Sequence, residues 1–138
     1  MAQAGKKKSQ ESFFTGTFSS FSVDSIEEAR EFYANTLDVD VTDNEEGGLE
    51  LNFPNGSSVF VYPKENHEPA TFTVLNFLVE DIDEAVDDLT DRGIIFESYD
   101  GEMETDEKGI FRGADDDNGP NIAWFKDPAE NFLSVIEQ

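Results

Sequence analysis

Cysteine is absent from this chain of 138 residues, and histidine occurs once, as His67. The sequence therefore has no disulfide framework, no thiolate zinc site and no cysteine nucleophile. Zinc, iron and nickel sites favour imidazole or thiolate ligands, of which this chain offers one. His67 stands in the polar segment PKENHEP, which favours a solvated loop histidine over a metal ligand.

Basic residues are scarce, with 9 Lys and Arg against 32 Asp and Glu and a net charge of -23. Such a surface repels phosphate backbones and anionic lipids, so we expect neither nucleic acid nor a membrane as partner. The carboxylates form either an ordinary solvated face or the adaptation of a halophile, because molar salt screens the self-repulsion of an acidic chain.

Long apolar runs are also missing, and residues 1–12 lack the apolar core of a signal peptide. We therefore expect a soluble, cytoplasmic protein. Hydrophobic residues make up 37% of the chain and include 13 Phe, which argues against disorder. We expect a flexible tail over residues 1–12 and a single domain over residues 13–138.

Within that domain one pattern occurs twice. Residues 13–23 and 71–79 are rich in Phe, Thr and Val and predict strands, and each is followed by a helix start. Ser25 with Glu28 and Asp81 with Glu84 both have capping-box spacing. The matching positions lie 56 residues apart, which indicates an internal repeat with modules over about residues 13–66 and 67–138.

Further strands are expected after each helix. In the first module they lie at residues 39–41, 49–53 and 59–62, with Asn55-Gly56 as a hairpin turn. In the second module we expect strands at 94–99, at 110–112 or 121–125, and at 132–136. Each module then reads β-α-β-β-β, and the fold class is α+β.

The end of the chain, AWFKDPAENFLSVIEQ, predicts a strand, a turn at Asp127-Pro128 and a last strand. The paired modules, the phrase EFY in the first helix and the closing FKDPAENF together resemble the vicinal oxygen chelate superfamily, which includes glyoxalase I, ring-opening dioxygenases and bleomycin-resistance proteins. The resemblance covers about residues 14–137. It implies a half-open, cup-shaped mixed sheet with helices outside, commonly in a homodimer.

In the metal enzymes of that superfamily, His and Glu ligands come from the opening strand and a late strand of each module. The resemblance places these positions at Phe18, at Val74, at Ser134 and, with the register left open, within residues 60–62. None of them is a histidine or a carboxylate. We therefore expect no metal site and no cofactor. The run Ala114 to Gly119 also fails the EF-hand template, which favours an acidic turn over a calcium loop.

The cup should instead have an apolar and aromatic lining with a few hydrogen-bonding groups. The expected ligand-binding residues are Phe18, Ser20, Ser22, Val74, Asn76, Leu78, Arg112, Trp124, Phe132 and Ser134. For Arg112 two interpretations stay open, a ligand anchor or an ion pair with Asp115 or Asp116, and for Trp124 the alternative is a place in the core. Residues 100–121 are long, acidic and punctuated by glycine, which suggests a flap.

The sequence thus predicts a metal-free protein that binds a small organic molecule and forms a homodimer. An enzyme remains the alternative, with a carboxylate-bound metal or with Glu50 as general base in a lyase, isomerase or dioxygenase. Glu50 could equally be a solvent-facing residue of an alternating strand. A dimeric interaction module without ligand is the second alternative.

Overall fold

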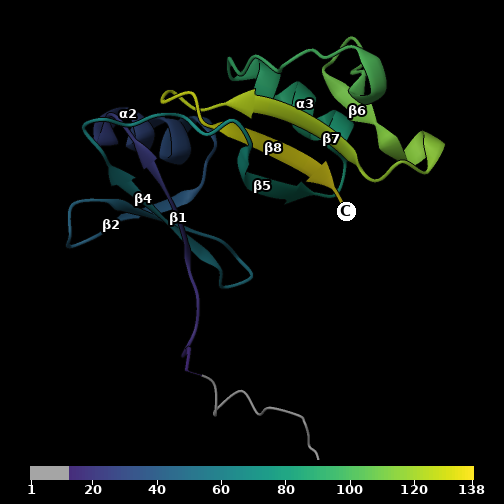
Figure 1. Cartoon of the computed structure of the whole chain (residues 1–138). Helices are drawn as coiled ribbons and strands as arrows, with labels where there is room; N and C mark the ends of the chain where they lie inside the picture. Colours follow the sequence, from purple (N-terminus) through teal and green to yellow (C-terminus); the bar gives the residue numbers. More distant parts are fainter. Residues whose placement is uncertain (1–12) are drawn as a thin grey trace, which may run out of the picture.

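The computed structural model describes residues 13–138, which form two sheets of four strands with one main helix each (Figure 1). Module one consists of β1 (Ser19–Val23), α2 (Ile26–Arg30) with its continuation η2 (Glu31–Thr36), β2 (Asp40–Asp43), β3 (Leu49–Asn52) and β4 (Ser58–Pro63). Module two consists of β5 (Thr73–Val79), α3 (Ile82–Asp91), β6 (Ile110–Arg112), β7 (Asn121–Lys126) and β8 (Phe132–Glu137). Short helical turns η3 (Gly101–Met103) and η4 (Gly113–Asp116) flank β6.

The two sheets have the same topology, which confirms the predicted repeat and the α+β class. Their strand orders are β1-β4-β3-β2 and β5-β8-β7-β6, with one parallel pair and two antiparallel pairs in each. Both helices are capped as predicted, since Ser25 Oγ accepts from the Glu28 amide and the Asp81 carboxylate accepts from the Glu84 amide. None of the helices described is long and apolar enough to cross a bilayer.

The strand pairs also fix the register that the sequence left open in module one. Ser20 lies beside Phe60, and the corresponding Asn76 lies beside Ser134. Phe60 is therefore the counterpart of Ser134.

Two predicted strand segments differ in the structure. Residues 94–99 are not a strand, although the Glu97 amide donates to the Trp124 carbonyl at 2.8 Å. Residues 13–18, which precede β1, are not part of the strand, because pairing with β4 begins at Ser19. Of the alternatives at 110–112 and 121–125, both form strands. The expected tail at residues 1–12 lies outside the described residues.

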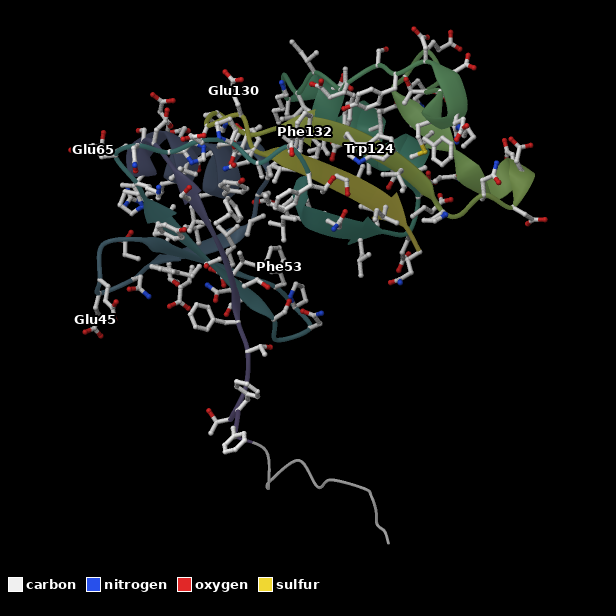
Figure 2. The ribbon with its side chains drawn as sticks, in the orientation of Figure 1. Glu45, Phe53, Glu65, Trp124, Glu130 and Phe132 are labelled. Atoms are coloured by element: carbon white, nitrogen blue, oxygen red, sulfur yellow. The ribbon has the colours of Figure 1, made fainter. Side chains whose placement is uncertain are left out.

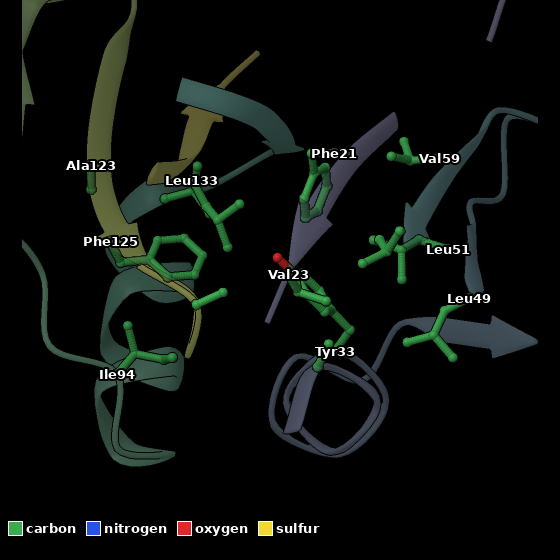
Figure 3. Close-up of a cluster of buried hydrophobic side chains, with 14 of the residues drawn as sticks. Phe21, Val23, Tyr33, Leu49, Leu51, Val59, Ile94, Ala123, Phe125 and Leu133 are labelled. Carbon is green, nitrogen blue, oxygen red and sulfur yellow. The ribbon is translucent and has the colours of Figure 1, made fainter. Parts of the chain in front are cut away.

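The core consists of side chains from the helix-facing side of both sheets. Phe21, Leu49 and Leu51 of module one and Phe125 and Leu133 of module two are all buried (Figure 3). Along each strand these positions alternate with residues on the opposite face, so the core residues determine which side chains that face presents.

Buried polar contacts join the two modules. Tyr33 of η2 donates its hydroxyl to Asp127 at 2.7 Å, and the Asn131 amide donates to the Ser22 carbonyl at 2.9 Å. Asp127 also accepts from the backbone amides of Ala129 and Asn131, both at 2.9 Å. The phrases EFY and FKDPAEN therefore meet in space and hold module two against module one.

Candidate functional site

The faces turned away from the helices carry most of the residues that the sequence singled out. Alternation places Ser20, Phe60, Glu50 and Thr42 side by side across the sheet of module one. In module two the corresponding row is Asn76, Ser134 and Trp124. By this register Glu50 is the counterpart of Trp124.

In module one these residues form a hollow of about 330 Å³, here named the module-one hollow. Its lining residues are Phe18, Asn44, Glu46, Glu50, Ser58 and Phe60. Glu50 is half-buried and accepts a hydrogen bond of 2.8 Å from the side-chain amide of Asn44. It is the strand-embedded carboxylate that the sequence offered as a candidate base.

The aromatic wall of this hollow is held in place by its neighbours. The Phe60 ring stacks on Tyr62, with centroids 5.8 Å apart and planes 26° apart. The ring also lies against Gly48, where an added Cβ would come within 2.6 Å of Phe60 Cε1. Gly48 therefore makes room for the ring, and Phe60 presents a defined face.

In module two a second hollow of about 250 Å³, the module-two hollow, is lined by Thr71, Thr73, Tyr99, Met103, Trp124 and Phe132. Tyr99 meets the Trp124 ring edge-on, with centroids 5.6 Å apart. Trp124 and Phe132 project from neighbouring strands on the same face (Figure 2). Trp124 thus lies on the outer face of the sheet and not in the core.

The predicted ligand-binding residues are not gathered in one cavity. Phe18 lines the module-one hollow, whereas Trp124 and Phe132 line the module-two hollow, and these two hollows share no residue. Asn76 and Leu78 line a third hollow of about 340 Å³ between β5 and the β3-β4 hairpin. Ser20 belongs to the outer face of module one but lines none of these three hollows. Val74 lies at the register shift of β5, packs against the core and also lines none of them.

Ser134 is completely buried, and its hydroxyl donates to the Asn76 side-chain oxygen at 2.6 Å. The exposed Asn76 is therefore the part of this pair that reaches the surface.

Ser22 is an expected ligand-binding residue, but in the structure its hydroxyl contacts His67. Its Oγ lies 2.6 Å from Nδ1 of His67, whose Nε2 lies 3.0 Å from the Ala129 carbonyl oxygen. Since a carbonyl can only accept, Nε2 carries a hydrogen and Nδ1 of the neutral ring accepts from Ser22. His67 is half-buried and bridges the two modules, so the interpretation as a simply solvated histidine is wrong.

Arg112 faces α3 and does not reach either hollow. Its guanidinium binds Asp83 at 2.7 Å and Asp106 at 3.0 Å, so the expected pair with Asp115 or Asp116 is replaced. These bonds raise the pKa of Arg112, and the Arg112 and Lys108 bonds hold the pKa of Asp83 well below its usual range. Lys108 joins the cluster through Asp83 and Asp87, both at 3.0 Å.

Lys108 and Arg112 thereby tie the predicted flap, residues 100–121, to α3. Met103, near the start of the flap, lines the module-two hollow. The sequence did not identify Tyr99 or Met103 as site residues, and it included Phe60 only within residues 60–62, where the register was left open. For Tyr99 and Phe60 the sequence did contain a signal of a binding role, because each is an aromatic residue in a predicted strand.

No group of three or more His, Cys, Asp or Glu that could hold a metal ion occurs within residues 13–138. At the positions where the resemblance places metal ligands, the side chains are Phe18, Val74, Ser134 and, by the register found here, Phe60. The residues present do not fit the metal site of the superfamily's enzymes.

Comparison with known proteins agrees with this architecture. The sequence profile of the Glyoxalase/Bleomycin resistance protein/Dioxygenase superfamily matches residues 17–135. No curated protein sequence matches the chain. Similar solved structures include a member of the same superfamily from Sphaerobacter thermophilus DSM 20745, with a TM-score of 0.62 and 24% identity over 89% of this chain and 98% of that one.

Two further structures show the same fold. A glyoxalase family protein from Enterococcus faecalis has a TM-score of 0.58 and 19% identity over 91% of this chain and 100% of that one. TnmS3, an antibiotic binding protein from Streptomyces sp. CB03234, has a TM-score of 0.62 and 19% identity over 91% of this chain and 98% of that one. With the profile match spanning most of its length, the chain belongs to the glyoxalase/bleomycin resistance protein/dioxygenase superfamily.

Proposed function

We propose that this protein is a metal-free, cytoplasmic small-molecule-binding protein that holds an organic ligand against the aromatic outer faces of its two sheets. The observation that carries the proposal is the replacement of the superfamily's metal-ligand positions by Phe18, Phe60, Val74 and Ser134, beside hollows walled by aromatic rings. Aromatic walls with a few polar groups suit recognition by shape and stacking. The fold shared with an antibiotic binding protein supports the same class of function.

We further propose that two copies complete the site. Within one chain the module-one and module-two hollows are separate, so a ligand that uses both would need the module-one face of one copy opposite the module-two face of the other. Exposed apolar side chains favour such an assembly, because Phe18 is 77% exposed and Leu78 is 58% exposed.

The chain supplies its own reporter for the test. Trp124 is its one tryptophan and lines the module-two hollow, so a ligand stacked there should change its fluorescence. The protein should be purified without chelators, assayed for metal, and titrated with a panel of aromatic compounds while Trp124 emission is recorded. We expect saturable quenching by at least one compound, no stoichiometric metal, and weaker binding in Phe132→Ala.

Phe72→Ala is the matched control, because Phe72 is exposed and lines none of the three hollows. Stoichiometric, tightly bound metal in the purified protein would overturn the proposal. So would a complete lack of binding across the panel together with no small molecule retained in native mass spectrometry, which would favour the dimeric interaction module.

An enzyme is the second candidate, because Glu50 lies in the module-one hollow and could act as a general base on a bound substrate. Turnover of a compound that binds, abolished by Glu50→Gln with binding retained, would establish this alternative.

A further inference from the structure

We infer that the module-one hollow recognises an organic cation, a quaternary or alkylated ammonium group, and that this is the chemical class of ligand for the proposed binding function. The inference rests on that proposed function and adds to it the charge of the ligand. The lining of the hollow contains aromatic rings and carboxylates but no basic residue.

Two aromatic side chains form a wall of the hollow. Phe60 and Phe18 line the hollow, and the Phe60 ring is held by its contacts with Tyr62 and Gly48. The negative charge on the face of an aromatic ring attracts cations, and cages of such rings take up quaternary ammonium groups. A volume of about 330 Å³ suits a trimethylammonium group with a short chain attached.

The carboxylate of Glu50 lies in the same hollow. Glu50 is placed on this face by strand alternation, because its neighbours Leu49 and Leu51 are both fully buried on the core side. Register places Glu50 directly beside Phe60. The carboxylate and the ring can therefore contact the same bound group.

No basic residue neutralises this carboxylate. The hollow is lined by Glu46 and Glu50 but by no Lys or Arg, and neither carboxylate forms an ion pair within residues 13–138. Asn44 donates a hydrogen bond to Glu50 but brings no charge. A half-buried carboxylate without a counterion favours a cationic ligand and repels an anionic one.

Module two provides the internal comparison. At the position that corresponds to Glu50 it has Trp124, and the lining of the module-two hollow includes no charged residue. Lys126 Nζ instead lies over the Phe132 ring, 5.0 Å from its centroid. The repeat therefore gives an aromatic hollow with carboxylates in module one and an aromatic hollow with a lysine at its edge in module two. A ligand with a cationic end and a planar apolar end would fit both.

The test uses three probes of nearly equal shape, namely choline, its neutral isostere 3,3-dimethylbutan-1-ol and the anion 3,3-dimethylbutanoate. Binding to the full chain is measured by calorimetry and by chemical-shift changes of the Glu50 and Phe60 amides, in 0.5 M salt to screen the diffuse charge of the surface. We expect choline to bind at least tenfold more tightly than the alcohol, and the anion not to bind.

Two matched variants separate a local effect from the overall charge. Glu50→Gln should weaken choline about tenfold and leave the alcohol unchanged. Glu45→Gln removes the same charge at the exposed β2-β3 turn, outside the hollow lining, and should change neither (Figure 2). Phe60→Leu, which removes the ring and keeps an apolar side chain, should weaken choline several-fold.

Equal affinity for choline and the alcohol, or equal losses in the Glu50 and Glu45 variants, would overturn the inference. If either of these results is found while an aromatic compound still quenches Trp124 fluorescence, the proposed binding function stands and only the ligand class is wrong. If neither choline nor any aromatic compound binds, the proposed function fails as well.

Discussion

Asp127 shows how one buried carboxylate can hold two modules together. It is 4% exposed and accepts hydrogen bonds from the Tyr33 hydroxyl, from the backbone amides of Ala129 and Asn131, and from the Asn131 side chain. Burying a charge is costly unless it is well hydrogen-bonded, and these four bonds provide that compensation. The contact explains why the closing turn and the first helix both have distinctive sequences.

Replacing Tyr33 by Phe should lower the free energy of unfolding by about 2 kcal/mol, because a hydrogen bond to a buried charge is lost. Urea unfolding measures this loss. Tyr62→Phe is the control, since Tyr62 is half-buried and stacks on Phe60, and its change should stay within about 0.5 kcal/mol. Equal losses in both variants would contradict the role given to the Tyr33-Asp127 bond.

The same tyrosine should make stability depend on alkaline pH. Burial, and then the Asp127 carboxylate, raise the pKa of Tyr33 well above its ordinary value. Above about pH 10 an unfolded tyrosine loses its proton while folded Tyr33 keeps it, so the folded state binds more protons and the free energy of unfolding falls as pH rises. Tyr33→Phe should reduce this slope and leave the contributions of Tyr99, whose pKa is raised mainly by burial, and of Lys108, whose pKa is raised by its bonds to Asp87 and Asp83. Equal slopes between pH 9 and 11 in the variant and the parent would speak against it.

At the scale of elements, the two modules use the same helix start with different cap residues, Ser25 and Asp81. Both caps have extended backbone and accept a bond from the amide three residues on. The first turn of each helix is acidic, which suits the positive end of the helix dipole.

Asp81→Ala should destabilise the protein by about 1 kcal/mol, because the cap bond is lost. Asp91→Ala, at the opposite end of the same helix, should be neutral or slightly stabilising, because a carboxylate there faces the negative end of the dipole. Thermal unfolding of the two variants compares them directly. A loss for Asp91→Ala as large as that for Asp81→Ala would point to total charge and not to position.

The flap, residues 100–121, depends on the scarce basic residues. Arg112→Gln should speed amide hydrogen exchange several-fold at Ile110, because the bonds to Asp83 and Asp106 are replaced by weaker ones. Arg30→Gln, which breaks the exposed pair with Asp43 in module one, should leave exchange in the flap unchanged. Unchanged exchange at Ile110 in the Arg112 variant would show that packing alone holds the segment.

For the whole molecule, the excess of acidic groups should oppose compaction. With 32 acidic and 9 basic residues, self-repulsion destabilises the folded state at low ionic strength. The melting temperature should therefore rise from 10 mM to 1 M potassium chloride, since the Debye length falls from about 30 Å to 3 Å. No gain over this range would remove the interpretation of the composition as an adaptation to high salt.

Assembly can be tested through the segment before β1. Figure 1 shows residues 13–18 extending away from both sheets, and Phe13 is 95% exposed. We expect sedimentation equilibrium in molar salt to show a dimer, and a chain shortened to begin at residue 18 to dimerise more weakly, because apolar area is removed from the contact. A chain that lacks only residues 1–12 is the matched control. A full-length chain that stays monomeric at high concentration would contradict the proposed assembly.

Much of the fold could be predicted from sequence because its signals are local. Cap spacing, the Asn-Gly turn and the Asp127-Pro128 turn depend on neighbours within a few residues, and all three form as expected. Residues 94–99 failed as a strand, since the Glu97 bond to the Trp124 carbonyl does not extend into a ladder along β7, and such pairing is not reported by any local pattern. Arg112 could not be placed, because its partners Asp83 and Asp106 compete with other carboxylates nearby in the sequence.

The sequence by itself determined that two copies of one βαβββ unit would form this protein, since periodicity and caps act over short distances and occur twice. Only the tertiary structure decided how the site is distributed. Strand register put Glu50 beside Phe60 and Trp124 beside Ser134, and contacts between residues far apart in the chain, such as Tyr33 with Asp127, set the modules against each other. These depend on packing across the whole molecule, where a shift of one residue would turn each side chain to the other face.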